Sequence, residues 1–194
     1  SYSFYIDGTS DRLVDPPADL TTDIACFGTV SLALEPGASR YAALLKNMHR
    51  DGTFIALDPN IRPFYATKAH SDFLYSLLPS VDLLKLSDEE EEFLDQPEAP
   101  IKVITCGPDG LIVHFNGQTI EVTAPTIEVA DTIGAVDTVI GCLLAEIHRR
   151  TGGKNVRSKT MEFAGEDWAE IASYAARAAA VTCTRVGANP PTRA

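Results

Sequence analysis

The stretch DTIGAVDTVIGCLLAEI, residues 131–147, joins a turn of small residues to an apolar helix. Gly134 and Ala135 stand where the helix is expected to begin, and Asp137 follows within its first turn. The first amides of a helix have no partner inside it, and the helix dipole makes that end positive. Small side chains let an anion approach such amides closely. We therefore interpret 131–137 as a strand-to-helix junction that binds a phosphate group, followed by a helix over 134–149.

An aspartate at such a junction has two interpretations. It can accept the proton of an attacking hydroxyl group, as phosphoryl transfer requires. It can also serve as a helix cap, and for Asp131 or Asp137 taken alone the cap explains the residue equally well. The rest of the sequence has to decide between these interpretations.

Upstream of this stretch, short apolar runs alternate with helical patterns. Such alternation predicts a parallel sheet with right-handed crossover connections. Ser87 is expected to cap the third helix, whose acidic residues suit a first turn. The predicted strands cover 24–30, 54–58, 81–86 and 101–106, and the predicted helices cover 35–52, 67–78 and 88–94.

The pattern changes after residue 110. Asn116-Gly117 lies between two strand-like runs and predicts a β-hairpin over 111–124. A polar loop is expected over 151–160, followed by an Ala-rich helix over 167–187 that ends at Gly187. The fold class is therefore α/β, with a mostly parallel sheet and helices on both faces, in a single domain over 1–194.

Composition excludes several classes of partner. The chain has 194 residues, 45% of them hydrophobic, and a net charge of −11, which argues against a nucleic-acid or anionic-membrane surface. No apolar run is long enough to span a membrane, so neither nucleic acid nor membrane is an expected partner. The four cysteines have no metal-binding spacing, and we interpret them as buried, reduced thiols of a cytoplasmic protein.

Ligands of open α/β sheets bind outside the carboxyl ends of the strands. Three further motifs lie at such ends, and each has a plain explanation when taken alone. LDPNIRP (57–63) is explained by a Pro-fixed turn, LLKLSDEE (83–90) by a capping box, and VITCGPDG (103–110) by an ordinary turn.

Taken together and in this order, the four motifs resemble those of the ribokinase-like (PfkB) carbohydrate kinases, most closely the fructokinases. DTIGAVDT resembles the family's D-T-x-G-A-G-D motif. The resemblance implies a ribokinase-like, Rossmann-like fold and ATP-dependent phosphorylation of a sugar hydroxyl, with fructose as the expected acceptor. It extends over nearly the whole chain through FYIDGTSDR (4–12), GTVSLALEPGASRYAALL (28–45) and AARAAAVTCTRVGANPPTR (175–193).

The resemblance also implies a role for each matching position. Asp137 would be the catalytic base, and Gly134, Ala135 and Val136 would supply amides to the transferred phosphoryl group. Glu90 would organise Mg²⁺ through water, and a monovalent cation such as K⁺ is common in the family. ATP would contact Lys85, Ser87, Glu90, Thr105, Gly107, Gly110, Ala179 and Asn189, and Asn60, Arg62 and Asp131 would line the sugar side.

Val136 departs from the motif, which has glycine at this position. Its two γ carbons would crowd the transferred phosphoryl group, and the loss of one such hydrogen-bond donor costs about 3–4 kcal/mol. We therefore expect severely reduced catalysis unless the site relaxes. The plain alternative is that Val136 packs inward as the helix begins.

The second departure concerns the region before Phe4. Relatives carry a Gly-Gly-rich stretch and a β-strand lid there, and many have an arginine where this chain has Ile6. A sheet without its first strands would expose an edge. A second hypothesis is therefore a catalytically inactive nucleotide- or sugar-binding pseudokinase or fragment with an interaction role. Relatives often dimerise through the lid, so a homodimer is one assembly to test.

Overall fold

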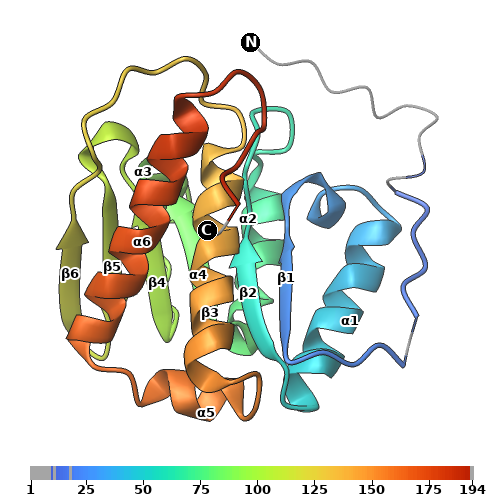
Figure 1. Ribbon diagram of the computed structural model, residues 1–194. Coiled ribbons are helices and arrows are strands. Elements are labelled where there is room, and N and C mark those ends of the chain that lie inside the picture. The colour runs from blue at the N-terminus through green and yellow to red at the C-terminus, as the bar shows by residue number, and fades with distance from the viewer. Residues whose placement is uncertain (1–9, 11, 18, 193–194) are drawn as a thin grey trace.

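The computed structural model describes residues 10, 12–17 and 19–192, so most of the FYIDGTSDR segment, including Ile6, lies outside the described residues. In the described part, six strands form one sheet in the chain order β1 to β6 (Figure 1). β1 to β4 are parallel, and β5 and β6 form an antiparallel hairpin around Asn116-Gly117, as predicted. The strands are β1 (Ile24–Gly28), β2 (Phe54–Asp58), β3 (Leu83–Ser87), β4 (Ile101–Thr105), β5 (Leu111–Phe115) and β6 (Gln118–Val122).

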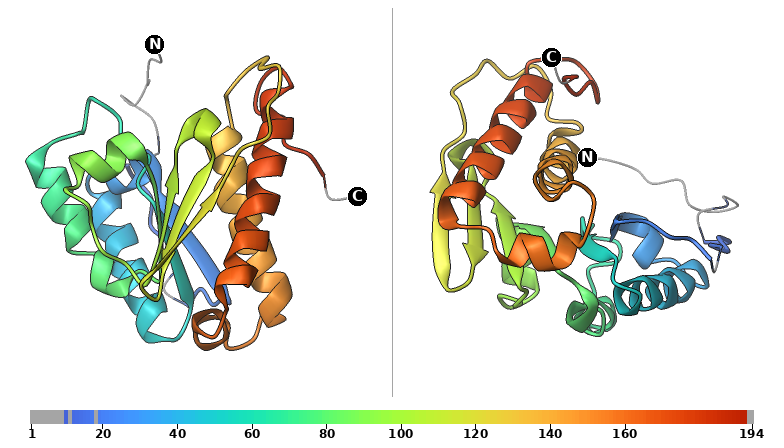
Figure 2. Two further views of the ribbon diagram at one scale, coloured as in Figure 1. Left: turned by 90° about the vertical axis from the view of Figure 1, so that its left-hand side faces the viewer. Right: turned by 60° about the horizontal axis from the view of Figure 1, so that its bottom comes forward.

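Helices cover both faces of the sheet, which confirms the predicted α/β class. Figure 2 shows α4 and α6 side by side on one face and α1, α2 and α3 on the other. The helices are α1 (Gly37–Arg50), α2 (Lys68–Tyr75), α3 (Asp88–Phe93), α4 (Ala135–Thr151), α5 (Val156–Met161) and α6 (Gly165–Cys183). Short 3₁₀ helices are η1 (Thr29–Leu32), η2 (Leu78–Ser80) and η3 (Gly107–Asp109).

The strands have two buried faces, so their residues alternate between two hydrophobic cores. In β2, Phe54 and Ala56 pack in the core under α4 and α6, which also contains Trp168. Ile55 and Leu57 pack in the opposite core, under α1 and α2. Near-continuous apolar runs in the sequence are the consequence of this double burial.

Three of the predicted segments are wrong in detail. The predicted strand-to-helix junction at 131–137 has no strand before it, because the amides of Ala130 and Asp131 donate to the carbonyl of Cys183 on α6, at 2.8 and 3.2 Å, instead of to a neighbouring strand. The predicted loop over 151–160 contains α5, whose Val156 and Thr160 are buried one turn apart. The first strand ends at Gly28, after which η1 begins.

The cysteine prediction is also partly wrong. All four cysteines are free thiols, but Cys26 is exposed and Cys106, Cys142 and Cys183 are half-buried. Cys26 lies on β1, which forms an edge of the sheet and pairs with β2 alone among the described strands. No helix in the described part of the chain is both long and apolar enough to cross a membrane.

A polar network fastens α5 to the amino ends of the central strands, at the lower edge of the sheet in Figure 1. Nε of Arg157 lies 2.8 Å from Oδ1 of Asp82, and its Nη2 donates to the carbonyls of His49 and Thr53. Oδ2 of Asp82 accepts the amide of Ile55 at 2.7 Å. Because the Asp82 side chain is 6% exposed, Arg157 neutralises a buried carboxylate.

Candidate active site

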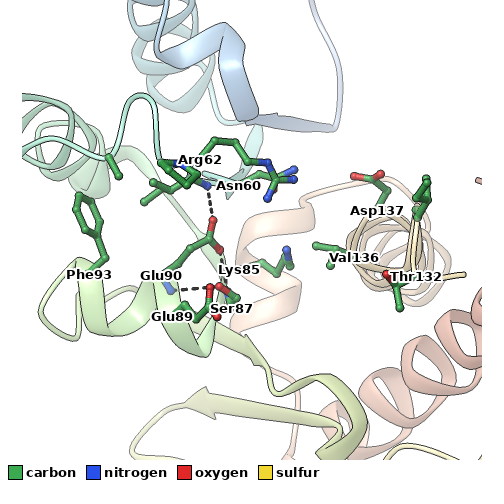
Figure 3. A pocket seen from close by; sticks show the side chains of 15 residues that line it. Asn60, Arg62, Lys85, Ser87, Glu89, Glu90, Phe93, Thr132, Val136 and Asp137 are labelled. Atoms are coloured by element: carbon green, nitrogen blue, oxygen red, sulfur yellow. Dashed lines mark hydrogen bonds between the residues drawn. The ribbon is translucent and has the colours of Figure 1, made fainter. Parts of the chain in front are cut away.

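A cleft of about 960 Å³ lies at the carboxyl ends of the parallel strands. Its walls are the loop after β2, the β3–α3 junction and the start of α4 (Figure 3). Figure 3 shows Lys85 and Glu90 on one side and Val136 and Asp137 on the other. The cleft therefore brings together eight of the predicted site residues: Asn60, Arg62, Lys85, Ser87, Glu90, Gly134, Val136 and Asp137.

The start of α4 presents unused hydrogen-bond donors. The amide of Ala135 donates to the carbonyl of Thr132 at 3.2 Å, whereas the amides of Gly134, Val136 and Asp137 have no partner among the described residues. Gly134 has φ 78°, and a Cβ there would lie 3.1 Å from Cβ of Ala188, so the turn requires glycine. These three amides and the helix dipole make an anion-binding end.

Neither aspartate near this turn caps the helix. Gly134 is the N-cap and has no side-chain hydrogen bond, so the capping interpretation is wrong. Asp137 is exposed and lines the cleft. Asp131 instead accepts the amides of Ile133 at 3.1 Å and Gly187 at 2.9 Å. The bond from Gly187, with that from Ile133, lowers the pKa of Asp131.

Asp131 therefore fastens the segment before α4 to the tail after α6. Asn189 lies in the same tail, where its amide donates to the carbonyl of Gly187 at 2.8 Å. Neither Asp131 nor Asn189 lines a cavity next to Asp137. A direct role for either residue in ligand binding remains a prediction from the sequence.

Two cationic side chains line the cleft, and only one of them is paired with a carboxylate of the described residues. Nζ of Lys85 donates to Oδ1 of Asp58 at 2.9 Å, and the Lys85 side chain is 1% exposed. Burial raises the pKa of Asp58 above its ordinary value, and Lys85 opposes that shift. Arg62 is half-buried and forms no ion pair with any residue that the structure describes. Arg62 is therefore the cation that remains available to an anionic ligand.

Glu90 links two walls of the cleft. Its Oε2 accepts the amide of Ser87 at 2.8 Å, and Oγ of Ser87 accepts the amide of Glu90 at 3.1 Å, which confirms the capping box. Its Oε1 accepts the amide of Ile61 from the loop after β2. Figure 3 shows both contacts. The buried carboxylate thus fixes the loop that carries Asn60 and Arg62.

Glu90→Gln should loosen this loop, because the new amide nitrogen cannot accept either backbone N–H. We expect the free energy of unfolding to fall by about 1–3 kcal/mol, with faster hydrogen exchange over residues 59–66. Denaturant unfolding and peptide-resolved exchange measure both. Glu92→Gln, at an exposed position of α3, is the matched control. Equal exchange in the two variants would contradict the assigned role of Glu90.

A second cavity, of about 600 Å³, is largely apolar and adjoins the cleft. Thr132 and Val136 line both spaces. Val136 is 38% exposed, so the expectation that it packs inward is wrong, and its side chain stands at the junction of the two cavities. Predicted site residues Thr105, Gly107, Gly110, Ala135 and Ala179 line the second cavity.

A third cavity, of about 310 Å³, lies on the other side of Asp137, between β1 and α4. Thr29, with φ 58°, and Tyr41 contribute hydroxyl groups to its lining. Gly28 admits no side chain, because a Cβ would lie 1.8 Å from the carbonyl oxygen of Asp58. Cys26 is exposed as a residue but lines this cavity, where desolvation of its thiol, together with the carboxylates of Asp58 and Asp137, raises its pKa to about 11.

The sequence motifs did not identify every residue around these cavities. Thr29 and Tyr41 belong to a segment quoted above only for its resemblance. The wall formed by residues 124–129 carries no chemically distinctive side chain apart from one glutamate. Its position beside α6 became visible only in the fold. The motif at 83–90 identified Glu90 as a site residue. Its hydrogen bond with the amide of Ile61 joins segments 29 residues apart and could not be predicted from the motif.

The fold and the site define an α/β protein in which free backbone amides at a helix start lie beside an exposed carboxylate. The chain belongs to the pfkB family of carbohydrate kinases, because the family model matches residues 22–194.

Named relatives agree with this assignment. A fructokinase from Rhizobium leguminosarum bv. trifolii is 31% identical over 167 residues, which are 76% of this chain and 51% of the relative. The chain thus spans about half the length of that relative. Fructokinase from Xylella fastidiosa with bound ATP superposes with a TM-score of 0.76 at 20% identity, covering 86% of this chain and 56% of the other.

A second solved structure has the same fold. Fructokinase from Vibrio cholerae O395, in a form with fructose, ADP and calcium bound, gives a TM-score of 0.74 at 21% identity, and the match covers 89% of this chain and 58% of the other.

Proposed function

We propose that this chain carries the ATP-binding and catalytic part of a sugar kinase with fructose as its acceptor. The observation that carries the proposal is the start of α4, where three unpartnered amides lie next to an exposed carboxylate. Three cavities meet around this helix start. The relatives that share its family are fructokinases.

The three cavities suggest a division of roles. The apolar cavity would hold the base of ATP, and the phosphates would extend past Val136 toward the free amides. The acceptor hydroxyl would lie beside Asp137, near the hydroxyl groups of Thr29 and Tyr41. Arg62 would contact a phosphate from the opposite wall of the cleft.

In the reaction, Asp137 takes the proton of the acceptor hydroxyl as its oxygen attacks the γ-phosphorus in line. The new O–P bond forms while the bond to the β–γ bridging oxygen breaks, and ADP leaves. The free amides of α4 stabilise the charge on the transferred group. Each of these residues is on the structured part of the fold, so little reorganisation is required.

The residues present fit a divalent ion bound mainly by the nucleotide. In the described part of the chain, no cluster of three or more carboxylate, imidazole or thiol groups could hold a metal by itself. Each oxygen of Glu90 accepts one amide and keeps a further lone pair, so Glu90 suits a contact to Mg²⁺ through water. The ion would neutralise phosphate charge when bound.

ADP release in the presence of fructose, ATP and Mg²⁺ tests the proposal. We expect release that depends on fructose and yields a sugar phosphate detectable by mass spectrometry. ATP binding without any transfer to fructose or to other sugars would instead favour the non-catalytic hypothesis. The position of Val136 at the cavity junction is the observation that keeps this second hypothesis open.

Val136→Gly should raise turnover by about tenfold, because glycine keeps the backbone N–H and removes the γ carbons at the junction of the two cavities, which lets the phosphoryl group approach the free amides. The same change should lower stability by about 1 kcal/mol, because glycine is a poor helix former. Steady-state kinetics and thermal unfolding measure the two effects. Val136→Ala should give an intermediate turnover, and a decrease with glycine would refute this explanation of the valine.

A further inference from the structure

The apolar cavity offers few groups that could read a base. Its walls are the turn around η3, residues 124–129, the start of α4 and the last turns of α6. None of the described residues that line it has a charged, amide or imidazole side chain. The polar side-chain atoms come from Thr105, Thr126, Thr132 and Cys183, and the hydroxyl of Thr105 donates to the carbonyl of Leu86 at 3.2 Å.

Most backbone groups in these walls are already engaged. The amide of Gly110 donates to Gly107, and its carbonyl accepts the amide of Cys106 at 2.9 Å. The carbonyl of Cys183 accepts the amides of both Ala130 and Asp131. Apart from the free amides in the first turn of α4, which would face the phosphates, backbone groups within α4 and α6 bond inside their helices.

The remaining wall is limited as well. Pro125 has no N–H, and the amide nitrogen of Ala124 packs against Gly110, where a Cβ would lie 2.8 Å from it. Among the described residues, the backbone groups that remain available to a base are therefore few, and they include those of residues 126–129 and the amide of Gly107. The cavity is therefore lined mainly by apolar side chains, and few of its polar groups are free to form a hydrogen bond with a base.

Resting on the proposed function, we infer that the donor site recognises a purine by shape and does not distinguish adenine from hypoxanthine. The chain then uses ATP and ITP with similar efficiency. Apolar pockets reject isosteres weakly, whereas sites built to hydrogen-bond a polar group reject its analogue by about 10⁴–10⁵-fold. Adenine and hypoxanthine have nearly the same shape and differ in the group at position 6, so only a hydrogen-bonding partner separates them.

Calorimetry with ADP and IDP tests the inference without requiring turnover. We expect the two dissociation constants to agree within about tenfold, and kcat/KM for ATP and ITP with fructose to agree in the same way. A preference for the adenine nucleotide larger than this would overturn the inference and would show that one of the few uncommitted groups of the cavity contacts the base.

Two variants on α6 control the position of the base. Ala179→Phe fills the cavity and should abolish binding of ADP and IDP together. Val181→Phe, at an exposed position outside the cavity, should leave both dissociation constants unchanged. Rejection of IDP alone overturns this inference only, whereas failure of the wild-type chain to bind any nucleotide overturns the proposed function as well.

Discussion

Asp137→Asn is expected to lower kcat by about 10³-fold, because asparagine keeps the shape of the side chain but cannot take the acceptor proton. Asp137 is exposed and has no cap bond to lose, so the protein should remain folded. The removal of a negative charge from the first turn costs about 0.3–1 kcal/mol at most. Binding of ADP, measured by calorimetry, should change by less than threefold.

Asp137→Asn is best measured both in the wild-type chain and in the Val136→Gly variant, because the higher parental kcat expected for Val136→Gly makes a decrease easier to measure. Asp51→Asn, at an exposed position after α1, is the control for loss of one carboxylate. A variant that kept more than a tenth of the parental kcat would remove Asp137 from the role of base. Loss of ADP binding in the same variant would show that Asp137 acts before the chemical step.

Arg157→Ala is expected to lower the free energy of unfolding by about 3–5 kcal/mol, because it leaves the buried Asp82 carboxylate without its cation. The change also removes donors from the carbonyls of His49 and Thr53. A loss of this size is a large fraction of the stability of an ordinary domain. Urea unfolding followed by circular dichroism measures it.

Two companion variants separate charge from packing. Arg50→Ala removes an exposed arginine that lies 3.8 Å from Asp51, and it should change stability by less than about 1 kcal/mol. Asp82→Asn in the Arg157→Ala background keeps an oxygen for the amide of Ile55 and removes the unpaired charge, so it should restore part of the loss. No restoration would mean that Arg157 acts mainly through packing.

The alternation of buried strands and helices could be predicted because residues on both faces of the sheet are apolar. The hairpin could be predicted from Asn116-Gly117, and the polar cleft from motifs at strand ends. The strand expected before the junction at 131–137 is absent, because the amides of Ala130 and Asp131 bond to the carbonyl of Cys183. Cys183 lies about 50 residues further along the chain, so the local sequence around residues 130 and 131 carries no sign of this hydrogen bond.

The site shows the same division. Asp137 and the small residues before it could be predicted, because their chemistry depends on local sequence at a helix start. The attachment of Asp131 to Gly187 and of Glu90 to Ile61 could not, because each joins distant segments. Val136 illustrates both cases: the motif identified it as unusual, but only the fold shows that it borders two cavities.

The outer edge of β1 affects how every assay above should be run. Among the described strands β1 pairs with β2 alone, and backbone groups on the free side of an edge strand can pair with a second polypeptide, so self-association would increase with protein concentration. Kinetic and calorimetric work should therefore include a dilution series, with light scattering as a monitor of particle mass. A synthetic peptide of alternating polar and apolar residues, added in excess, would report whether that edge accepts a guest strand.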